Sequence, residues 1–592
     1  QGPQSDGVSI ISPGGYAGIG QTRSLPIFRI ENTFHPRIDF TKLAGGHSVK
    51  FGMDARRRQI TQYQTNRGNG RFNFGRTFTD NPNATANTGE TMAAFLLGTA
   101  NFIEQDFTLV FPGFRQTEWS YYVQDDWKVN DALTLNIGLR YEYDTPVVEV
   151  ADRQTNFDVA TGKLLIAGFN TDSATGVKPD RNNFAPRFGF AYRVRQGTVV
   201  RGGIGVFYNP AGSENVYMRR HRQLPFGPIV TEDINQFNPN PKRVQDGFQP
   251  IPNLDFATVA ENPVGSMLAV VPNFRSGYTP QFNFQIQQQM PMEMVAKVGF
   301  VGNVGRRLDT TYGYNQPEPG PGAQGPRRPL FGIAPGVVNV DYMVSDGMSS
   351  YNSFQASLER RFANGVGFLT AYTYAHSIDM VANAFGGADN GPIPQDRRCR
   401  HDCERSASGF DIRQRFTHSM NYSLPFGRGR QNSFDSKIVD AFLGGWDTNA
   451  ILTLQSGLPF TPTLASPVSN AGGSRPDRLA KGTIDNPDPF LWFDTSFNTS
   501  GAAWGLPQQF TFGNSARNVL YGPGRVNLDW SVFKNFSITE KMRIQFRAEF
   551  FNLFNTPQFD LPNGSIGSPA AGRITNVVGN PRQVQLGLRL AF

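Results

Sequence analysis

The sequence predicts an all-β protein, an antiparallel β-barrel with long loops, and three observations support this fold class. The first is composition: of 592 residues, 12 % are aromatic, 63 are glycine and 41 are proline, which does not suit a helical bundle. The second is a strict alternation of apolar and polar residues, which is typical of strands. The third is that short and long connections alternate between the predicted strands.

The composition also excludes other classes of protein. Charged residues are only 18 % of the chain, which disfavours intrinsic disorder because disordered chains are rich in charge and poor in aromatic residues. The longest uninterrupted apolar run, Met92–Leu97, is far shorter than the ~20 residues of a membrane-spanning helix. Two cysteines exclude a disulfide scaffold and a zinc-finger array.

The alternation is clearest over 133–143, where leucine, isoleucine and tyrosine point one way and polar or small residues point the other. The same pattern covers 542–550 and 583–592. Applied to the whole chain, it predicts about seventeen strands. They lie near 28–40, 47–61, 70–78, 100–110, 115–128, 133–146, 184–195, 198–209, 279–290, 294–305, 350–362, 366–377, 411–425, 443–457, 522–535, 541–553 and 582–592.

The connections separate into two kinds from residue 128 onward. Short ones lie near 129–132, 196–197, 290–293, 363–365 and 539–541, and 426–442 is expected to be a helical turn. Long ones are 147–183, 210–278, 306–349, 378–410, 458–521 and 554–581. Short periplasmic turns and long extracellular loops are typical of a transmembrane barrel. The predicted strands are also long enough for a tilted crossing of a bilayer, which needs ~9–11 residues.

A barrel in lipid also explains why the strands have two different faces. Hydrocarbon cannot satisfy backbone polar groups, so only a closed sheet with an apolar outer face is tolerated, while a wide interior holds water and polar side chains. An antiparallel sheet packed on a core is the alternative, because it alternates too. Aromatic residues near strand ends match the girdles of such barrels. They are Trp119, Tyr121, Tyr122, Trp127, Tyr141 and Tyr143.

Several sequence motifs accompany the strand pattern. The first two are Tyr121–Lys128, YYVQDDWK, and Leu133–Glu142, LTLNIGLRYE. Further motifs are GGHSVKFG at 45–52, APRFGF at 185–190, GGW at 444–446, QSGLPF at 455–460, RAEFFNLFN at 547–555 and the terminal Phe592. In their order and spacing, these motifs resemble the barrel of TonB-dependent outer-membrane receptors, most closely the Oar-like group.

The resemblance implies parts that this chain does not show. Such receptors have a periplasmic TonB box, a globular plug and usually 22 strands. Seventeen strands that end in the periplasm must begin outside, so an odd number is expected upstream, and five more would give 22. We therefore expect one domain over 1–592, a transmembrane barrel that is incomplete at its N-terminus, with plug and TonB box absent.

Two cysteines lie in a long connection that is predicted to be extracellular. A disulfide between Cys399 and Cys403 is the leading interpretation, because the outer surface is oxidising and a five-residue loop can close. The alternative is a metal site that adds His401 and Asp402, although four ligands within five residues make tetrahedral geometry awkward.

Other loop residues are candidates for ligand contact. Arg219, Arg220 and Arg222 could contact lipopolysaccharide phosphates or an anionic ligand, and a solvated basic loop is the alternative. Trp492 and Trp504 are candidate aromatic anchors, because aromatic side chains present a large apolar area at low entropy cost. Packing of loop against loop is the alternative for both tryptophans.

The strands supply two further sets of candidates. Polar residues expected to face the lumen, where they form ladders with acidic neighbours, are Arg140, Arg187, Arg201, Arg543, Arg547 and Glu549. The last strand resembles the C-terminal signal that the barrel assembly machinery reads, and its residues are Leu588, Leu590 and Phe592.

The sequence contains no Walker A, His-Glu-x-x-His or Gly-x-Ser-x-Gly motif, so we expect no enzyme activity, cofactor or resident metal. The basic residues are spread over the strands, which does not suit nucleic-acid binding. The resemblance implies TonB-energised uptake of an unidentified ligand across the outer membrane of a Gram-negative bacterium. Expected partners are lipid and lipopolysaccharide, the barrel assembly machinery and, through the absent N-terminal part, the TonB complex. A passive porin and a surface adhesin or scaffold barrel are the alternatives.

Overall fold

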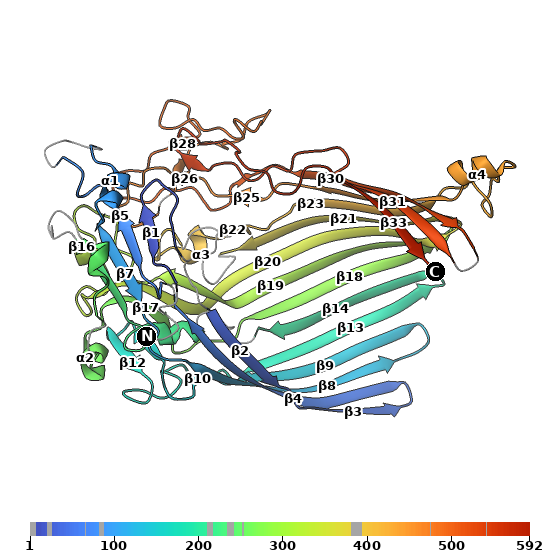
Figure 1. Ribbon diagram of the computed structural model, residues 1–592. Coiled ribbons are helices and arrows are strands. Elements are labelled where there is room, and N and C mark those ends of the chain that lie inside the picture. The colour runs from blue at the N-terminus through green and yellow to red at the C-terminus, as the bar shows by residue number, and fades with distance from the viewer. Residues whose placement is uncertain are drawn as a thin grey trace.

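The computed structural model describes most of the chain (Figure 1). The described residues are 7–20, 27–65, 67–81, 88–209, 217–233, 242–250, 254–380, 394–473, 475–539 and 542–592. Predicted connections such as 210–278 and 378–410 therefore lie partly outside the described residues. Among the described residues, no helix is both long and apolar enough to cross a membrane.

One large antiparallel sheet forms the wall of the molecule (Figure 1). β2 and β3 lie end to end and both pair with β4, while the other long strands pair in chain order. These strands are β2 (Ile27–Phe34), β3 (Arg37–Ala44), β4 (His47–Gln64), β8 (Gly113–Lys128), β9 (Leu133–Asp144), β13 (Asn183–Arg195), β14 (Thr198–Tyr208), β18 (Tyr278–Met290), β19 (Met294–Gly313), β20 (Val337–Ala363), β21 (Val366–Asp379), β23 (Gln414–Ser423), β24 (Trp446–Gln455), β30 (Arg525–Ser537), β31 (Arg543–Phe551) and β33 (Gln583–Ala591). Three short strands join this sheet at its loop end: β10 (Val148–Glu149), β17 (Gly265–Val270) and β22 (Ser406–Ala407).

Two of the predicted wall strands, 70–78 and 100–110, are wrong. They correspond to β5 (Arg71–Phe74) and β7 (Phe102–Asp106), which form a separate sheet with β1 (Ile10–Pro13) and β15 (Ile229–Asp233). At four and five residues they are too short to cross a bilayer. Their alternation serves a small core outside the wall instead, in which Phe72, Phe74 and Ile103 are buried. The other predicted strands fall in the wall.

The remaining elements are short and lie in the connections. Helical elements are α1 (Thr91–Leu96), α2 (Phe256–Glu261), α3 (Arg400–Cys403) and α4 (Lys437–Leu443), with 3-10 turns η2 (Tyr217–Arg222), η3 (Val244–Asp246) and η4 (Gly325–Arg327). Small strand pairs are β6 (Thr99–Ala100) with β16 (Lys242–Arg243), β11 (Thr155–Asp158) with β12 (Lys163–Ile166), β25 (Pro459–Phe460) with β29 (Leu520–Tyr521), β26 (Thr463–Leu464) with β32 (Ser565–Ile566), and β27 (Asp477–Arg478) with β28 (Trp504–Gly505).

The wall has one apolar face that is exposed. Phe284, Phe300, Phe354 and Tyr374 lie directly opposite one another on four successive strands, and each is between 41 and 50 % exposed. Exposed aromatic side chains in register across several strands are unfavourable in water but suit contact with lipid. The opposite face carries polar groups such as Arg140, whose guanidinium lies 2.6 Å from Glu142 and 3.3 Å from Asp54 on β4.

The connections at the two ends of the wall differ as the sequence predicts. Tight turns close one end, for example Asn364–Gly365 between β20 and β21, where both residues have positive φ angles. This conformation is typical of two-residue hairpins and favours asparagine and glycine. The long connections gather at the other end, on the left of Figure 1. The medium connection contains α4, so the predicted helical turn is confirmed.

Helix α4 fixes a lysine that stands on the apolar face of the wall. Lys534 lies opposite Trp446 and Phe546, which share its face. Its ammonium group donates to the carbonyl oxygens of Asp440 at 3.1 Å and Ala441 at 2.7 Å, and also to that of Gly444. The C-terminal carbonyls of the helix thus satisfy a charge on the apolar face of the wall.

The wall has two edges within the described part of the chain. There, β33 pairs only with β31, and β2 and β3 pair only with β4. Figure 1 shows β3 and β33 at opposite sides of the sheet. Unpaired backbone groups are not tolerated in hydrocarbon, so an incomplete wall that further strands complete remains our prediction.

Hydrogen exchange tests these edges. In the folded chain in detergent, we expect the amides of β33 and β2 that have no partner to exchange at least ~10-fold faster than those of β19, because β19 is paired on both sides. Peptide-resolved mass spectrometry measures this, with β19 as the internal control. Equal protection of β33 and β19 would show that the edges are paired.

Replacing Lys534 tests the role of α4. Lys534→Met removes three hydrogen bonds to the helix, so we expect α4 to detach and trypsin to cleave after Lys437 at least ~10-fold faster. Heat-modified migration of the barrel in gels should not change. Lys297→Met, which removes a partly exposed pair with Glu359, is the control. Cleavage at the same rate in Lys534→Met and the parent protein would contradict this role.

Candidate functional site

The long connections pack together at one end of the wall, and we call them the loop cap: the described residues of 65–112, 145–182, 209–277, 314–336, 380–413, 456–524 and 552–582. Their apolar side chains form cores of their own. One core includes Leu164, Ile166 and Leu330, and another includes Phe460 and Phe493. The loop cap is therefore a folded layer rather than a set of separate loops.

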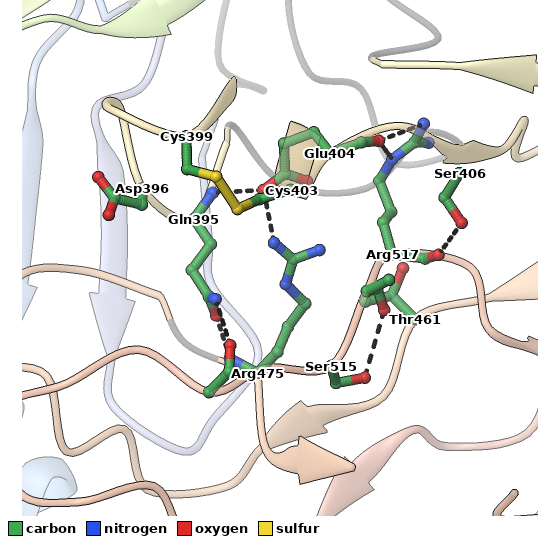
Figure 2. Close-up of polar contacts among 12 residues, drawn as sticks. Gln395, Asp396, Cys399, Cys403, Glu404, Ser406, Thr461, Arg475, Ser515 and Arg517 are labelled. Atoms are coloured by element: carbon green, nitrogen blue, oxygen red, sulfur yellow. Dashed lines mark hydrogen bonds and ion pairs between the residues drawn. A yellow bond between two sulfur atoms is a disulfide. The ribbon is translucent and has the colours of Figure 1, made fainter. Parts of the chain in front are cut away.

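A disulfide and a buried ion pair organise one part of the loop cap (Figure 2). Cys399 and Cys403 are bridged, with their Cα atoms 5.4 Å apart, which uses both sulfurs that the metal alternative requires. His401 contacts Asp346 instead, at 3.4 Å. Among the residues with described positions, no group of three or more His, Cys, Asp or Glu side chains is placed to hold a metal ion.

Glu404 follows the disulfide directly and pairs with an arginine from another connection. The Arg475 guanidinium lies 2.5 Å from the Glu404 carboxylate, and their side chains are only 3 % and 2 % exposed. Gln395 completes the arrangement: its backbone N–H donates to Glu404 at 3.0 Å, and its side-chain oxygen accepts from the backbone N–H of Arg475 at 2.5 Å. These bonds join 380–413 to 456–524.

A second buried ion pair joins the loop cap to the wall. Arg517 pairs with Asp379, the last residue of β21, and their side chains are 1 % and 5 % exposed. Arg517 also donates to the carbonyl oxygen of Asp379 at 3.0 Å and to that of Glu404 at 3.4 Å. Asp379, Arg517 and Glu404 therefore connect the end of a wall strand to the residue beside the disulfide.

A cavity of about 630 Å³ lies beside these ion pairs. Its lining includes Arg328, Arg397 and Arg475, and no acidic residue is among the described residues that line it. Neutral side chains complete the lining, among them Tyr312, Asn315, Gln316, Pro317, Gln324, Asn339, Val340, Gln395, Leu464 and Pro467. The cavity thus combines apolar surface with three arginine side chains.

The three arginines differ in how they are satisfied. Arg397 pairs with Glu318 at 2.5 Å and donates to the carbonyl oxygen of Gln316 at 3.4 Å. Arg475 uses one nitrogen for Glu404, but its buried Nε and Nη1 atoms have no hydrogen-bond partner among the residues that the structure describes. The buried Nε of Arg328 also has none. Buried donors are normally paired, so these three nitrogens stand out.

Asp396 illustrates the electrostatics at the rim of this region. Burial by itself raises the pKa of the Asp396 carboxyl, but hydrogen bonds from the side chain and backbone N–H of Arg398 outweigh burial and lower the pKa. The Arg398 guanidinium lies 2.9 Å from Asp396 and 2.5 Å from Glu318. The Asp396 carboxylate at the rim is thus already paired with Arg398.

The predicted basic contact residues Arg219, Arg220 and Arg222 do not line this cavity. Arg220 is fully buried, and its guanidinium donates to Thr175 Oγ1 at 2.5 Å and the Val147 carbonyl at 3.0 Å, so the expectation of an accessible side chain is wrong. Arg222 donates to Gln64, and burial, with the nearby charge of Arg219, lowers the pKa of Arg222 to about 10. Arg219 is exposed.

The predicted tryptophan anchors lie in the second apolar core of the loop cap. Trp504 is completely buried against Phe493, and its Nε1 donates to the Asp494 carbonyl at 2.6 Å. Trp492 packs on the same core and donates to the Tyr521 carbonyl at 2.9 Å. An exposed anchor at Trp504 is therefore wrong, and the alternative of loop packing describes both tryptophans. The apolar area that suits ligand binding suits a core equally well.

The predicted lumen residues share the polar face of the wall. Paired positions place Arg140, Arg187, Arg201, Arg543, Arg547 and Glu549 opposite to the exposed apolar face. Arg187 lies over the ring of Phe207, at 4.8 Å, and Arg547 donates to Gln545 at 2.9 Å. On the apolar face of β33, Leu588 and Leu590 are exposed, followed by Phe592. Lumen contact and the assembly signal stay predictions.

Comparison with known proteins identifies a family for almost the whole chain. A family model described as an outer membrane β-barrel domain matches residues 1–585. No curated protein matches the sequence.

Several solved structures resemble the fold. The outer membrane transporter YddB from Escherichia coli has 11 % identity and a TM-score of 0.48, with 95 % of this chain and 54 % of that chain covered. The ferric-catecholate import receptor Fiu from E. coli K12 has 11 % identity and a TM-score of 0.43, with 97 % of this chain and 56 % of that chain covered. The ferric preacinetobactin receptor BauA from Acinetobacter baumannii has 10 % identity and a TM-score of 0.41, with 95 % of this chain and 54 % of that chain covered. This chain spans about half the length of these proteins.

Breaking the ion pair between wall and loop cap should open the loop cap alone. Asp379→Asn leaves Arg517 buried without a counter-charge, which costs ~3–5 kcal/mol of loop-cap stability. We expect trypsin to cut within 456–524 while the wall keeps its heat-modified migration. Asp131→Asn, which breaks the exposed pair with Lys128, is the matched control. Unchanged resistance of 456–524 to trypsin would contradict the anchoring role.

Proposed function

The chain belongs to the outer membrane β-barrel domain family, and on this premise we propose that it is the barrel part of a receptor that takes up a small ligand with energy from the TonB complex. Its place is the outer membrane of a Gram-negative bacterium. The Oar-like group is the subgroup we propose, on the sequence motifs given above. In this role the protein binds and passes its ligand without making or breaking bonds.

The observation that carries the proposal is the cavity in the loop cap. Binding sites for small molecules are concave, of about 300–1,000 Å³, and combine apolar surface with a few polar groups. The cavity beside Arg475 has this size and this lining. A ligand that enters from outside meets the loop cap first, because the long connections gather at that end of the wall (Figure 1).

Two alternatives remain candidates and differ in what they need from the loop cap. A passive porin needs an open mouth, whereas here the buried pair of Glu404 with Arg475 holds 380–413 to 456–524. The buried pair of Asp379 with Arg517 holds 456–524 to the wall. An adhesin or scaffold barrel needs an exposed contact surface, and a recessed cavity has no role in it. The packed loop cap therefore supports a receptor better than either alternative.

Ligand depletion from the growth medium tests the function although the ligand is unidentified. Three cultures are compared by mass spectrometry of the spent medium: the parent strain, a deletion of the full-length gene, and the parent with a protonophore. We expect at least one compound that only the untreated parent removes, because TonB draws on the proton gradient.

The alternatives give different outcomes in the same experiment. Depletion that the protonophore does not slow indicates a passive porin. Equal depletion by the parent and deletion strains, with the protein at normal abundance on the surface of the parent, indicates an adhesin or scaffold. This result would contradict the proposed uptake.

A further inference from the structure

We propose that helix α4 is a lipid anchor, whose apolar face lies among the phospholipids that surround the end of the wall closed by tight turns. The proposal needs only the place of the wall in the outer membrane, so it holds or fails independently of the proposed uptake. Three features support it: the exposed apolar face of α4, the attachment of the helix to the lipid side of the wall, and the apolar side chains at the neighbouring tight turns.

Helix α4 is amphipathic, and its apolar face is the exposed one. The side chains of Ile438, Val439, Phe442 and Leu443 are between 38 and 73 % exposed. With ~3.6 residues per turn, these four positions share one side of the helix, and Lys437 points to the other side. Soluble proteins rarely leave contiguous apolar patches in contact with water. This face of α4 is therefore expected to have a partner.

The polar side of α4 is held by the segment that precedes the helix. Asp440 accepts a hydrogen bond from the backbone N–H of Arg428 at 2.9 Å. Just past the helix, the backbone N–H of Gly445 donates to the Phe426 carbonyl at 2.8 Å. These bonds fix the orientation of α4, so the apolar face is the side that stays open.

The C-terminal end of α4 lies on the lipid side of the wall. Lys534 stands on the apolar face of β30 but is only 4 % exposed, because the end of the helix covers it. Trp446 shares that face, donates to the Phe442 carbonyl at 2.8 Å, and packs edge-on against Phe546 with ring centroids 6.1 Å apart. The exposed face of α4 is therefore continuous with the apolar face of the wall, which suits lipid.

The helix is attached at the level where the wall leaves the bilayer. In Figure 1, α4 lies at the end of the wall opposite the loop cap. About 13 Å of extended strand separates Lys534 from Ile538 at the tight turn after β30. Ile538 is exposed, and so are Met292 and Phe362 at two other tight turns.

A phospholipid leaflet is the partner that fits this position. Amphipathic helices bury their apolar face at the boundary between headgroups and acyl chains. The apolar face of α4 begins beside Trp446, and tryptophan is typical of that boundary. Because lipid surrounds the wall at this level, the apolar face of α4 meets lipid without any further partner protein.

Site-specific fluorescence in lipid vesicles tests the anchor. Single-cysteine variants of the full-length protein each carry one fluorophore, which is selective because both native cysteines are bridged. Phe442→Cys and Ile438→Cys place the label on the apolar face. Lys437→Cys places it on the opposite side of the same helix and is the matched control. The proteins are reconstituted in vesicles of phosphatidylethanolamine and phosphatidylglycerol that contain a spin-labelled phospholipid, which quenches a fluorophore in contact with lipid.

We expect the spin-labelled phospholipid to quench the labels at 442 and 438 at least ~3-fold more than the label at 437, because only the apolar face enters the leaflet. Iodide, a quencher dissolved in water, should act in the reverse order. Leu586→Cys on the exposed apolar face of β33 gives the value for lipid contact, and Leu479→Cys in the loop cap gives the value for an exposed apolar position in water.

The outcomes decide between lipid and another partner. Equal quenching by lipid at 442 and 437 overturns the anchor. Protection of 442 from iodide in native outer membranes but not in the vesicles also overturns it, because the face then contacts a protein. Heat-modified migration checks that each labelled protein is folded. If Phe442→Cys does not fold, Ile438→Cys decides alone.

Discussion

Backbone hydrogen bonding in hydrocarbon is the constraint on which the rest of this structure depends. A strand in lipid has no water to bond, so each N–H and C=O group needs a neighbouring strand. The long ladders follow from this need, such as the one between β19 and β20, which runs from Met294 opposite Arg360 to Gly313 opposite Asp341. Because side chains alternate along each strand, the same ladder fixes one apolar face toward lipid and one polar face.

The loop cap is stabilised differently from the wall. It lies beyond the wall strands and contains buried charged side chains. Inside it, two arginines are almost fully buried against single carboxylates. Buried ion pairs contribute little net stability compared with apolar packing. The loss of one partner is nevertheless strongly destabilising, because the other charge stays buried without a counter-charge. They therefore specify which segments meet. Here they select contacts between residues more than 70 and more than 130 positions apart, Glu404 with Arg475 and Asp379 with Arg517.

The wall could be predicted from the sequence because its signal is local, whereas the loop cap could not. Alternation over 133–143 marks β9 whichever strands lie beside it, yet the same alternation at Phe72 and Phe74 belongs to a small core. The periodicity alone does not distinguish apolar residues that face lipid from apolar residues that face a protein core. In the loops the signal is weaker still, because Arg220 and Arg475 look alike in sequence. Only the fold shows that carbonyl oxygens accept from Arg220, whereas two buried nitrogens of Arg475 have no partner within the described part of the chain.

The wall and the loop cap meet at the end of β21, and this junction connects the cavity to the barrel. The strand crosses the wall, ends at Asp379 and there pairs with Arg517, which also reaches the carbonyl oxygen of Glu404. Glu404 in turn holds Arg475 at the cavity. The cavity is therefore joined to a wall strand through two buried ion pairs, Glu404 with Arg475 and Asp379 with Arg517. Each pair is favourable only while both of its partners are in place.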